Sequence, residues 1–164
     1  MREIFDRVSI RRFTDQAVEG EKLEALLRAA MAAPSAGNQQ PWEFYVVTDR
    51  AMLRSLAKAS PYAGCAANAP AAIVSAYRTD SRLPEYAQID MSIAMENLWL
   101  ATLEQGLGGV WLGIAPIEER MRAVEEIVGL PATQRAFAVF PVGYPAESCP
   151  QQNRFEPERI HYRR

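Results

Sequence analysis

Hydrophobic residues recur at helical spacing in four segments of the chain. An apolar stripe along residues 21–33 predicts an amphipathic helix that ends before Pro34, because proline disfavours helical geometry in the residue that precedes it. Asp49 is a typical helix N-cap and predicts a second helix that runs through AMLRSLAKA, residues 51–59. Further helices are expected over about 85–105 and over 116–128.

Apolar runs rich in aromatic and β-branched residues predict the strands. These runs are Glu43–Thr48, Ala71–Tyr77, 110–114 and Ala136–Tyr144. The last run shows no alternation, so we expect it to be buried on both faces. Helices and strands alternate without the strict rhythm of a parallel βαβ fold. We therefore expect one α+β domain over residues 1–164, with a central, mainly antiparallel sheet flanked by helices.

The segment from Glu85 to Gln105 carries apolar residues on almost every side. A helix of this kind is expected to be buried on nearly all sides. A monomer of this size has difficulty covering one helix completely, whereas two copies packed against each other can do so. The segment therefore predicts a homodimer.

The overall composition excludes several classes of protein. The chain has 18 Lys and Arg residues against 20 Asp and Glu residues, a balance that indicates neither nucleic-acid binding nor a disordered acidic tail. Cys65, Cys149 and the single histidine, His161, lack the spacing of a zinc site or a disulfide framework. We find no signal-peptide pattern and no run of the roughly 20 apolar residues that a membrane helix needs. These features favour a cytoplasmic protein.

Basic and hydroxyl groups gather in RVSIRRF, residues 7–13. Arg7 and Arg11 flank the hydroxyl of Ser9 in a loop that is expected to follow one helical turn. Guanidinium forks and hydroxyls are the groups that hold a phosphate. Taken alone, however, such a segment is more often a basic surface stretch near a flexible N-terminus.

The stretch APSAGNQQPW, residues 33–42, has more amide and hydroxyl groups than a helix-to-strand connection needs. The Ser35 hydroxyl and the Asn38 and Gln40 amides lie beside the backbone that Pro34 makes rigid. Neutral donors and acceptors of this kind can bind a flat heterocycle. An ordinary polar turn explains the same residues equally well when the stretch is considered alone.

Two other segments are weaker candidates. Glycines in GLGGVWLGIAP, residues 106–116, can let the backbone approach a ligand, although most such runs are only a helix end and a turn. The run lacks the pattern of a dinucleotide-binding loop. Arg154, in the polar and proline-rich C-terminal stretch, is another candidate for a phosphate contact. No serine-nucleophile motif is present, so the chain offers few side chains for chemistry.

Taken in this order, the segments resemble the FMN-dependent nitroreductase family. RVSIRRF is similar to the family's RRSxRxF motif, APSAGNQQPW to APSxxNxQPW, and DMSIAMENLWLATLEQGLGG to a helix that ends in GLG. The tail, with PVGYPAE and RFEPERIHY, is similar to the end of the family's short members. The resemblance implies a three-layer sandwich that forms an intertwined homodimer. The C-terminal arm, residues 145–164, would embrace the partner subunit.

The resemblance also implies which residues hold FMN. The first group would bind the phosphate and the ribityl chain: Arg7, Ser9, Arg11 and Arg154, with a backbone contact from Val8. The second group would contact the flavin of the other subunit: Pro34, Ser35, Asn38 and Gln40. The backbone of Gly113, Ile114 and Ala115 would lie beside the flavin N5.

Two positions depart from the family's pattern. Val8 stands where the motif has its second arginine, which is expected to lower the affinity for the phosphate. Pro116 lacks a backbone N–H that relatives could use near the flavin O4.

The activity implied is a ping-pong reaction in which NADH or NADPH passes a hydride to flavin N5 and a small electron acceptor then takes it up. Nitroaromatic compounds and quinones are the acceptors implied. No catalytic side chain is expected, because the flavin carries the hydride. Two alternatives stay open: a flavin-dependent reductive dehalogenase, and a flavin-binding redox sensor without turnover.

Overall fold

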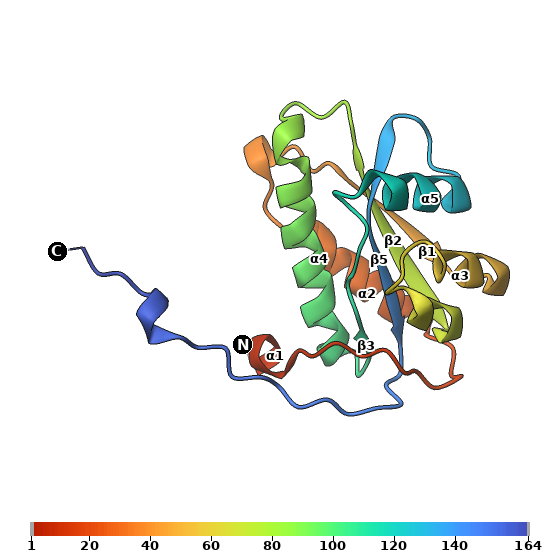
Figure 1. The fold of residues 1–164 in the computed structure, drawn as a ribbon, viewed down its shortest axis with the longest axis horizontal. Coiled ribbons are helices and arrows are strands. Elements are labelled where there is room, and N and C mark those ends of the chain that lie inside the picture. The colour runs from red at the N-terminus through yellow and green to blue at the C-terminus, as the bar shows by residue number, and fades with distance from the viewer. Residues whose placement is uncertain (1, 164) are drawn as a thin grey trace.

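The computed structural model describes residues 2–163, and its helices lie on the two faces of a single sheet (Figure 1). The helices are α1 (Arg2–Asp6), α2 (Gly20–Met31), α3 (Arg50–Leu56), α4 (Ala87–Glu104) and α5 (Glu118–Val128). All four helices predicted from the spacing of apolar residues are confirmed, with ends that differ by a few residues. The prediction that Pro116 begins α5 is wrong by two residues, because Ile117 is the N-cap and the helix starts at Glu118.

The sheet is antiparallel throughout its named strands, as predicted. Its order is β1-β2-β5-β3, and β4 also pairs with β5. The strands are β1 (Trp42–Val47), β2 (Ala71–Arg78), β3 (Gly108–Gly109), β4 (Leu112–Gly113) and β5 (Gln134–Gly143).

The single strand predicted over residues 110–114 is wrong. Two short strands occupy this region, and Val110 and Trp111 separate them. Pro141 of β5 lies opposite this gap and has no N–H to donate, so the ladder of hydrogen bonds is interrupted there.

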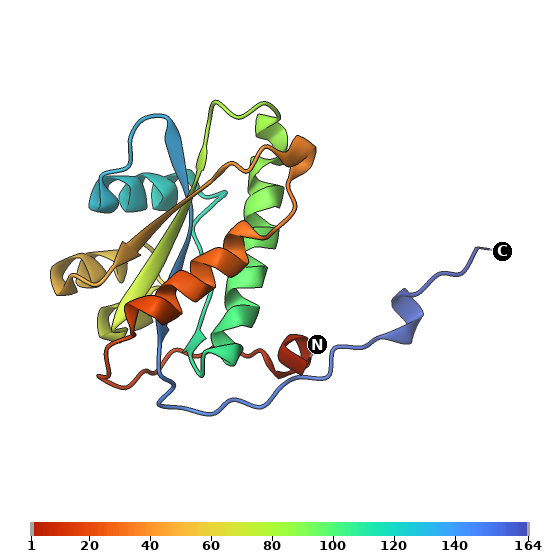
Figure 2. The same cartoon turned by 180° about the vertical axis from the view of Figure 1, so that it is seen from behind.

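The two faces of the sheet carry two separate apolar clusters. Ile73 and Phe140 point to the face that α2 and α4 cover. Val74 and Val139, each one residue away, point to the face that α3 and α5 cover. The alternation therefore gives the three layers predicted from the sequence, with the sheet in the middle (Figure 2).

A β-bulge interrupts this alternation in β5. The register between β2 and β5 shifts between Ser75 and Ala76, and Phe137 has no partner on β2. Phe137 and Ala138 consequently face the same cluster, although they are adjacent in sequence. The carbonyl of Phe137 is free to accept the backbone N–H of Ala115 at 2.9 Å. The bulge thus fixes the segment that follows β4 against the edge of the sheet.

Helix α4 is buried on one side only. Met91, Met95 and Leu98 have no exposed surface, whereas Ile89 is 56% and Ile93 is 37% exposed. One chain therefore does not cover α4 on nearly all sides, and the expectation that a second copy covers the remainder stays a prediction. The sheet and α2 cover one side of α4, and no described element of the same chain covers the side that carries these isoleucines.

The C-terminal arm leaves the body of the fold. Residues 150–163 are exposed and extend away from the sheet, with one short turn at Pro157–Arg159 (Figure 1). Within residues 2–163, no helix has the length and apolar character that crossing a membrane requires.

The close packing of Gly108 generates a first prediction. A Cβ atom on this residue would lie 2.7 Å from Cγ1 of Ile10 and 3.1 Å from Cγ of Pro145. Gly108→Ala should therefore lower the free energy of unfolding by about 1–3 kcal/mol, because the neighbouring segments must move apart. Urea denaturation measures the change.

Gly20→Ala is the matched control, since no atom lies within 4 Å of the added Cβ. The control should be at least as stable as the wild type, because alanine is the better helix former. A Gly108→Ala protein with wild-type stability would contradict the packing described here.

Candidate functional site

Residues 7–13, which we call the arginine loop, run from α1 across the end of the sheet. The backbone N–H of Ile10 donates to the carbonyl of Gly109 at 3.0 Å, and Ser9 forms a bridge with the same glycine. Further along, the N–H of Thr14 donates to the carbonyl of Tyr144 at 2.9 Å. The loop is therefore held on β3 and on the residue that follows β5.

The first part of the C-terminal arm lies antiparallel to the arginine loop. The N–H of Ala146 donates to the carbonyl of Arg12 at 2.9 Å, and Nε2 of Gln151 donates to the carbonyl of Arg7 at 3.1 Å. Between these contacts, one carboxylate oxygen of Glu147 accepts the N–H of Arg11 at 2.5 Å and that of Arg12 at 3.1 Å. The two segments thus form one unit, although they come from opposite ends of the sequence.

A pocket of about 360 Å³ lies between the loop and the arm, and we call it the arginine pocket. Its basic and hydroxyl lining consists of Arg7, Ser9, Arg11 and Arg154. The structure therefore brings together all the side chains predicted to hold a phosphate. No carboxylate is among the described residues that line the pocket. Within residues 2–163, the side chains of Arg11 and Arg154 form no ion pair. Unpaired guanidinium groups around a hydroxyl fit the phosphate of FMN.

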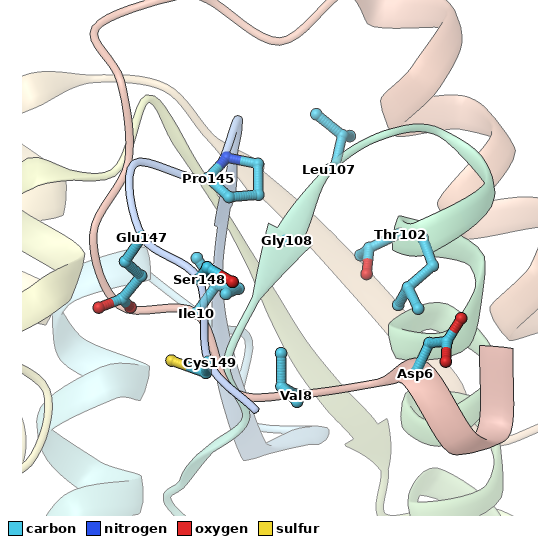
Figure 3. A pocket seen from close by; sticks show the side chains of 11 residues that line it. Asp6, Val8, Ile10, Thr102, Leu107, Gly108, Pro145, Glu147, Ser148 and Cys149 are labelled. Carbon is cyan, nitrogen blue, oxygen red and sulfur yellow. The ribbon is translucent and has the colours of Figure 1, made fainter. Parts of the chain in front are cut away.

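Val8 lines the arginine pocket and also a neighbouring pocket of about 200 Å³ (Figure 3). Ile10, Leu107 and Pro145 give the second pocket an apolar wall, and Cys149 lines both pockets. A valine therefore suits the position at which the sequence motif departs from its second arginine.

The stretch 33–42, which we call the amide loop, has an unusual backbone. Asn38 and Gln40 adopt positive φ angles of 53° and 49°, next to Gly37 with a φ of 55°. Such conformations are rare for residues with a side chain and persist only where the surroundings fix them. The hydroxyl of Ser35 contributes by accepting the N–H of Gln40 at 2.9 Å. Pro34, Asn38 and Gln40 are exposed and thus open to a ligand.

Two residues that sequence reasoning missed hold the amide loop in place. Asp90, only 2% exposed, accepts the N–H of Ala36 at 2.8 Å and Nε2 of Gln39 at 2.7 Å. Gln39 also accepts the N–H of Leu83 at 2.8 Å. The sequence did contain a signal for Asp90, because it is a carboxylate in the first turn of a largely apolar helix. A carboxylate that is buried in such a place needs hydrogen-bond donors from other segments. No comparable signal separated Gln39 from Gln40.

The amide loop and the arginine pocket contact different parts of α4. The amide loop is bound at Asp90, whereas Arg7 contacts Glu96 and Trp99. Nine residues of helix correspond to about 14 Å along its axis. The described lining of the arginine pocket includes no residue of the amide loop. One chain therefore does not unite the two groups predicted to hold the cofactor.

The segment predicted to lie beside the flavin N5 is partly engaged within the fold. Ile114 has no exposed surface, and the N–H of Ala115 is bonded to the bulge at Phe137. Gly113 is exposed, and no atom lies within 4 Å of the position that a Cβ would take. Its carbonyl accepts Nη1 of Arg120 at 3.2 Å. Gly113 therefore offers the open surface of this segment.

Groups suited to covalent or metal catalysis are scarce in this region. Burial raises the pKa of the Cys65 thiol above its ordinary value of 9.0, against the opposing effect of Arg11, so that the thiol is protonated near neutral pH. Among residues 2–163, no cluster of three or more His, Cys, Asp and Glu side chains can hold a metal ion.

Comparison with known proteins places the whole chain among similar sequences. The model of the nitroreductase family matches residues 4–67 and 60–144. A protein of Archaeoglobus fulgidus, provisionally named NADH dehydrogenase/NAD(P)H nitroreductase, is 42% identical over 168 residues that cover 98% of this chain and 95% of the relative.

Solved structures are similar over the same range. A provisionally named NADH oxidase of Clostridium acetobutylicum superposes with a TM-score of 0.95 at 43% identity, covering 99% of both chains. An FMN-dependent nitroreductase of Clostridium difficile superposes with a TM-score of 0.92 at 28% identity, covering 100% of this chain and 99% of the other.

The contact of Glu147 with the arginine loop generates a prediction of pH dependence. The backbone N–H of Arg11, followed by that of Arg12, holds the pKa of the Glu147 carboxyl below its ordinary value of 4.5. A lowered folded-state pKa means that this contact stabilises the protein above about pH 4.5 and that the contribution is lost as the pH falls through the folded-state pKa.

Backbone NMR measures the pKa of the Glu147 carboxyl through the amides that bind it. The amide signals of Arg11 and Arg12 should titrate together with a midpoint below 4.5. Glu147→Gln should abolish that titration, because the amide side chain carries no titratable proton. A midpoint at or above the ordinary value, or a titration that persists in the variant, would show that the carboxylate does not bind these amides.

Proposed function

The chain belongs to the nitroreductase family of FMN-dependent NAD(P)H oxidoreductases, and we propose that it reduces nitroaromatic compounds, quinones or similar small electron acceptors. The family resemblance recognised from the sequence motifs is thereby confirmed. FMN supplies the hydride chemistry when it is bound, and NADH or NADPH is the source of the hydride. The protein holds the cofactor and leaves room for small substrates.

The arginine pocket is the observation that carries this proposal. In it, Arg7, Arg11 and Arg154 provide positive charge and Ser9 a hydroxyl, and the described lining has no carboxylate to oppose a bound phosphate. Val8 contributes only its backbone and an apolar side chain to this site. The open surface at Gly113 leaves space for a flat ring to approach the backbone of residues 113–115.

We propose that a second copy of the chain completes the site. Ile89 and Ile93 leave an apolar side of α4 uncovered, and covering it would favour dimer formation. If two α4 helices pack antiparallel about a two-fold axis, the first turn of one helix meets the second half of the other. The partner's copy of the amide loop would then face the arginine pocket. This arrangement accounts for the separation of the two groups within one chain.

The C-terminal arm fits the same arrangement. Beyond Gln151 its residues are exposed, and Phe155, Ile160 and Tyr162 are 71%, 43% and 74% exposed. Apolar side chains on an extended segment are suited to covering another surface. We propose that this part of the arm embraces the partner subunit.

Because Cys65 and Cys149 are free thiols, we also propose that the protein acts in the reducing cytoplasm.

Purified protein should be yellow, and its flavin absorbance should bleach when NADH or NADPH is added without oxygen. Steady-state oxidation of the nicotinamide should follow when menadione or a nitroaromatic compound is supplied.

Arg11→Ala should weaken FMN binding by about 1.5–3 kcal/mol, because a charge-assisted contact with the phosphate is lost.

Arg122→Ala is the matched control, since this exposed arginine on α5 is paired with Glu118 at 3.8 Å and does not line the arginine pocket. Its FMN affinity should equal that of the wild type. A colourless protein that does not bind added FMN would refute the proposed function. Binding without turnover on any acceptor would favour the redox-sensor alternative.

The dimer can be tested through the open side of α4. Ile93→Glu, combined with Ile89→Glu, should give a monomer in analytical ultracentrifugation, because charges would be buried in the proposed interface. The monomer should also lose most of its FMN, since the partner's amide loop would be absent.

Val46→Glu provides the comparison, because this residue of β1 is 43% exposed and lies outside the proposed interface. That variant should remain dimeric and retain FMN. A double variant on α4 that is still dimeric, or a monomer with full FMN content, would be inconsistent with the shared site.

A further inference from the structure

The side chain of Arg7 is the most enclosed of the cationic groups in the arginine pocket. It is only 15% exposed, and its Cζ atom lies 4.0 Å from the centre of the Trp99 ring. Its Nε atom lies 3.5 Å from a carboxylate oxygen of Glu96. Both contacts come from α4, so the helix fixes the guanidinium from one side. Neither contact was predicted from the sequence.

Trp99 is itself fixed by the core. Its ring packs edge-on against Phe140 of β5, with 5.8 Å between the centroids and an angle of 73° between the planes. Because Phe140 has no exposed surface, the indole stands between the sheet and the guanidinium. The position of Arg7 is thereby coupled to the packed core through the indole.

The choice of tryptophan is not explained by packing alone. Its Nε1 atom is buried and has no hydrogen-bond partner within residues 2–163. A buried donor without a partner costs about 1–3 kcal/mol, a cost that phenylalanine would avoid. Indole, however, attracts a cation over its face more strongly than a benzene ring does. The contact with Arg7 is the feature for which the indole is the better side chain.

The stacking also determines which atoms of Arg7 remain available. A guanidinium held over an aromatic ring by a cation–π contact keeps N–H groups that can still donate to another partner. Nε lies 3.5 Å from the Glu96 carboxylate, which leaves the Nη groups for another partner. Arg7 lines the arginine pocket together with Ser9 and Arg11. The Nη groups are therefore the ones that can bind an anion there.

We propose that Trp99 is a positioning residue for the cofactor phosphate. It holds the Arg7 guanidinium over its ring on α4, so that the Nη groups serve the arginine pocket, while the Glu96 carboxylate attracts Nε. This inference rests on the proposed function, because it assumes that the phosphate of FMN binds in that pocket. Trp99 acts only through Arg7 and does not touch the cofactor.

Comparing two flavins separates this role from a structural one. FMN carries the phosphate and riboflavin lacks it, so a residue that acts through Arg7 affects only FMN. Dissociation constants for both flavins are measured by quenching of flavin fluorescence. Trp99→Leu should weaken FMN binding about 2- to 30-fold, the range expected for loss of a cation–π contact. Riboflavin binding should be unchanged, so the preference for FMN falls.

Trp111→Leu is the matched control. Trp111 also packs edge-on against a phenylalanine of β5, Phe137, with 5.6 Å between the centroids, but it has no contact with Arg7 among those described. This variant should keep the wild-type preference for FMN. Trp99→Phe retains an aromatic face and should show a smaller loss of preference than Trp99→Leu, and it carries the test if the leucine variant does not fold.

A double variant completes the test. In the Arg7→Ala background, Trp99→Phe should not change the preference for FMN any further, because the group that it positions is absent. Equal weakening of both flavins, or an unchanged preference in both Trp99 variants, would overturn the inference while leaving the proposed function intact. A wild-type protein that binds neither flavin would overturn both.

Discussion

Helix α4 carries apolar residues on two of its sides, and the need to cover both sides determines how the rest of the molecule is arranged around it. The sheet and α2 satisfy one side, where Met91, Met95 and Leu98 are fully buried. The other side remains open in one chain. Because a helix is rigid, whatever binds to it is held at a fixed spacing, and both halves of the proposed cofactor site are attached to it. Asp90 anchors the amide loop near one end, and Trp99 supports Arg7 further along.

The arginine pocket depends on a second kind of contact, between backbone groups of two loops. Neither the arginine loop nor the start of the arm has a regular partner strand, yet each satisfies polar groups of the other through Ala146, Glu147 and Gln151. The positively charged guanidinium groups would repel one another if no other contacts held the two loops together. The Glu147 carboxylate accepts backbone N–H groups and does not pair with the guanidinium of Arg11. Its negative charge nevertheless offsets part of the positive charge around the pocket.

Much of this structure was predictable from the sequence. The features that were missed can each be traced to a physical reason. Helices and strands followed from the spacing of apolar residues, and the motifs placed Arg7, Ser9, Arg11 and Arg154 in what proved to be one pocket. The split between β3 and β4 was missed because it depends on Pro141, a residue of another strand. Gln39 and Trp99 were missed because their partners are distant in sequence, and no local pattern marks such contacts.

The distance along the chain between the two loops has a consequence for the order of folding. Gln151 and Arg7, which close one side of the pocket, are separated by 144 residues. Contacts with so large a separation are entropically costly until other structure has brought the two segments together. Pairing of β5 with β2 and of β3 with β5 does this. We therefore expect the pocket to assemble late, so that a chain with a nearly complete core would still lack the means to retain its cofactor.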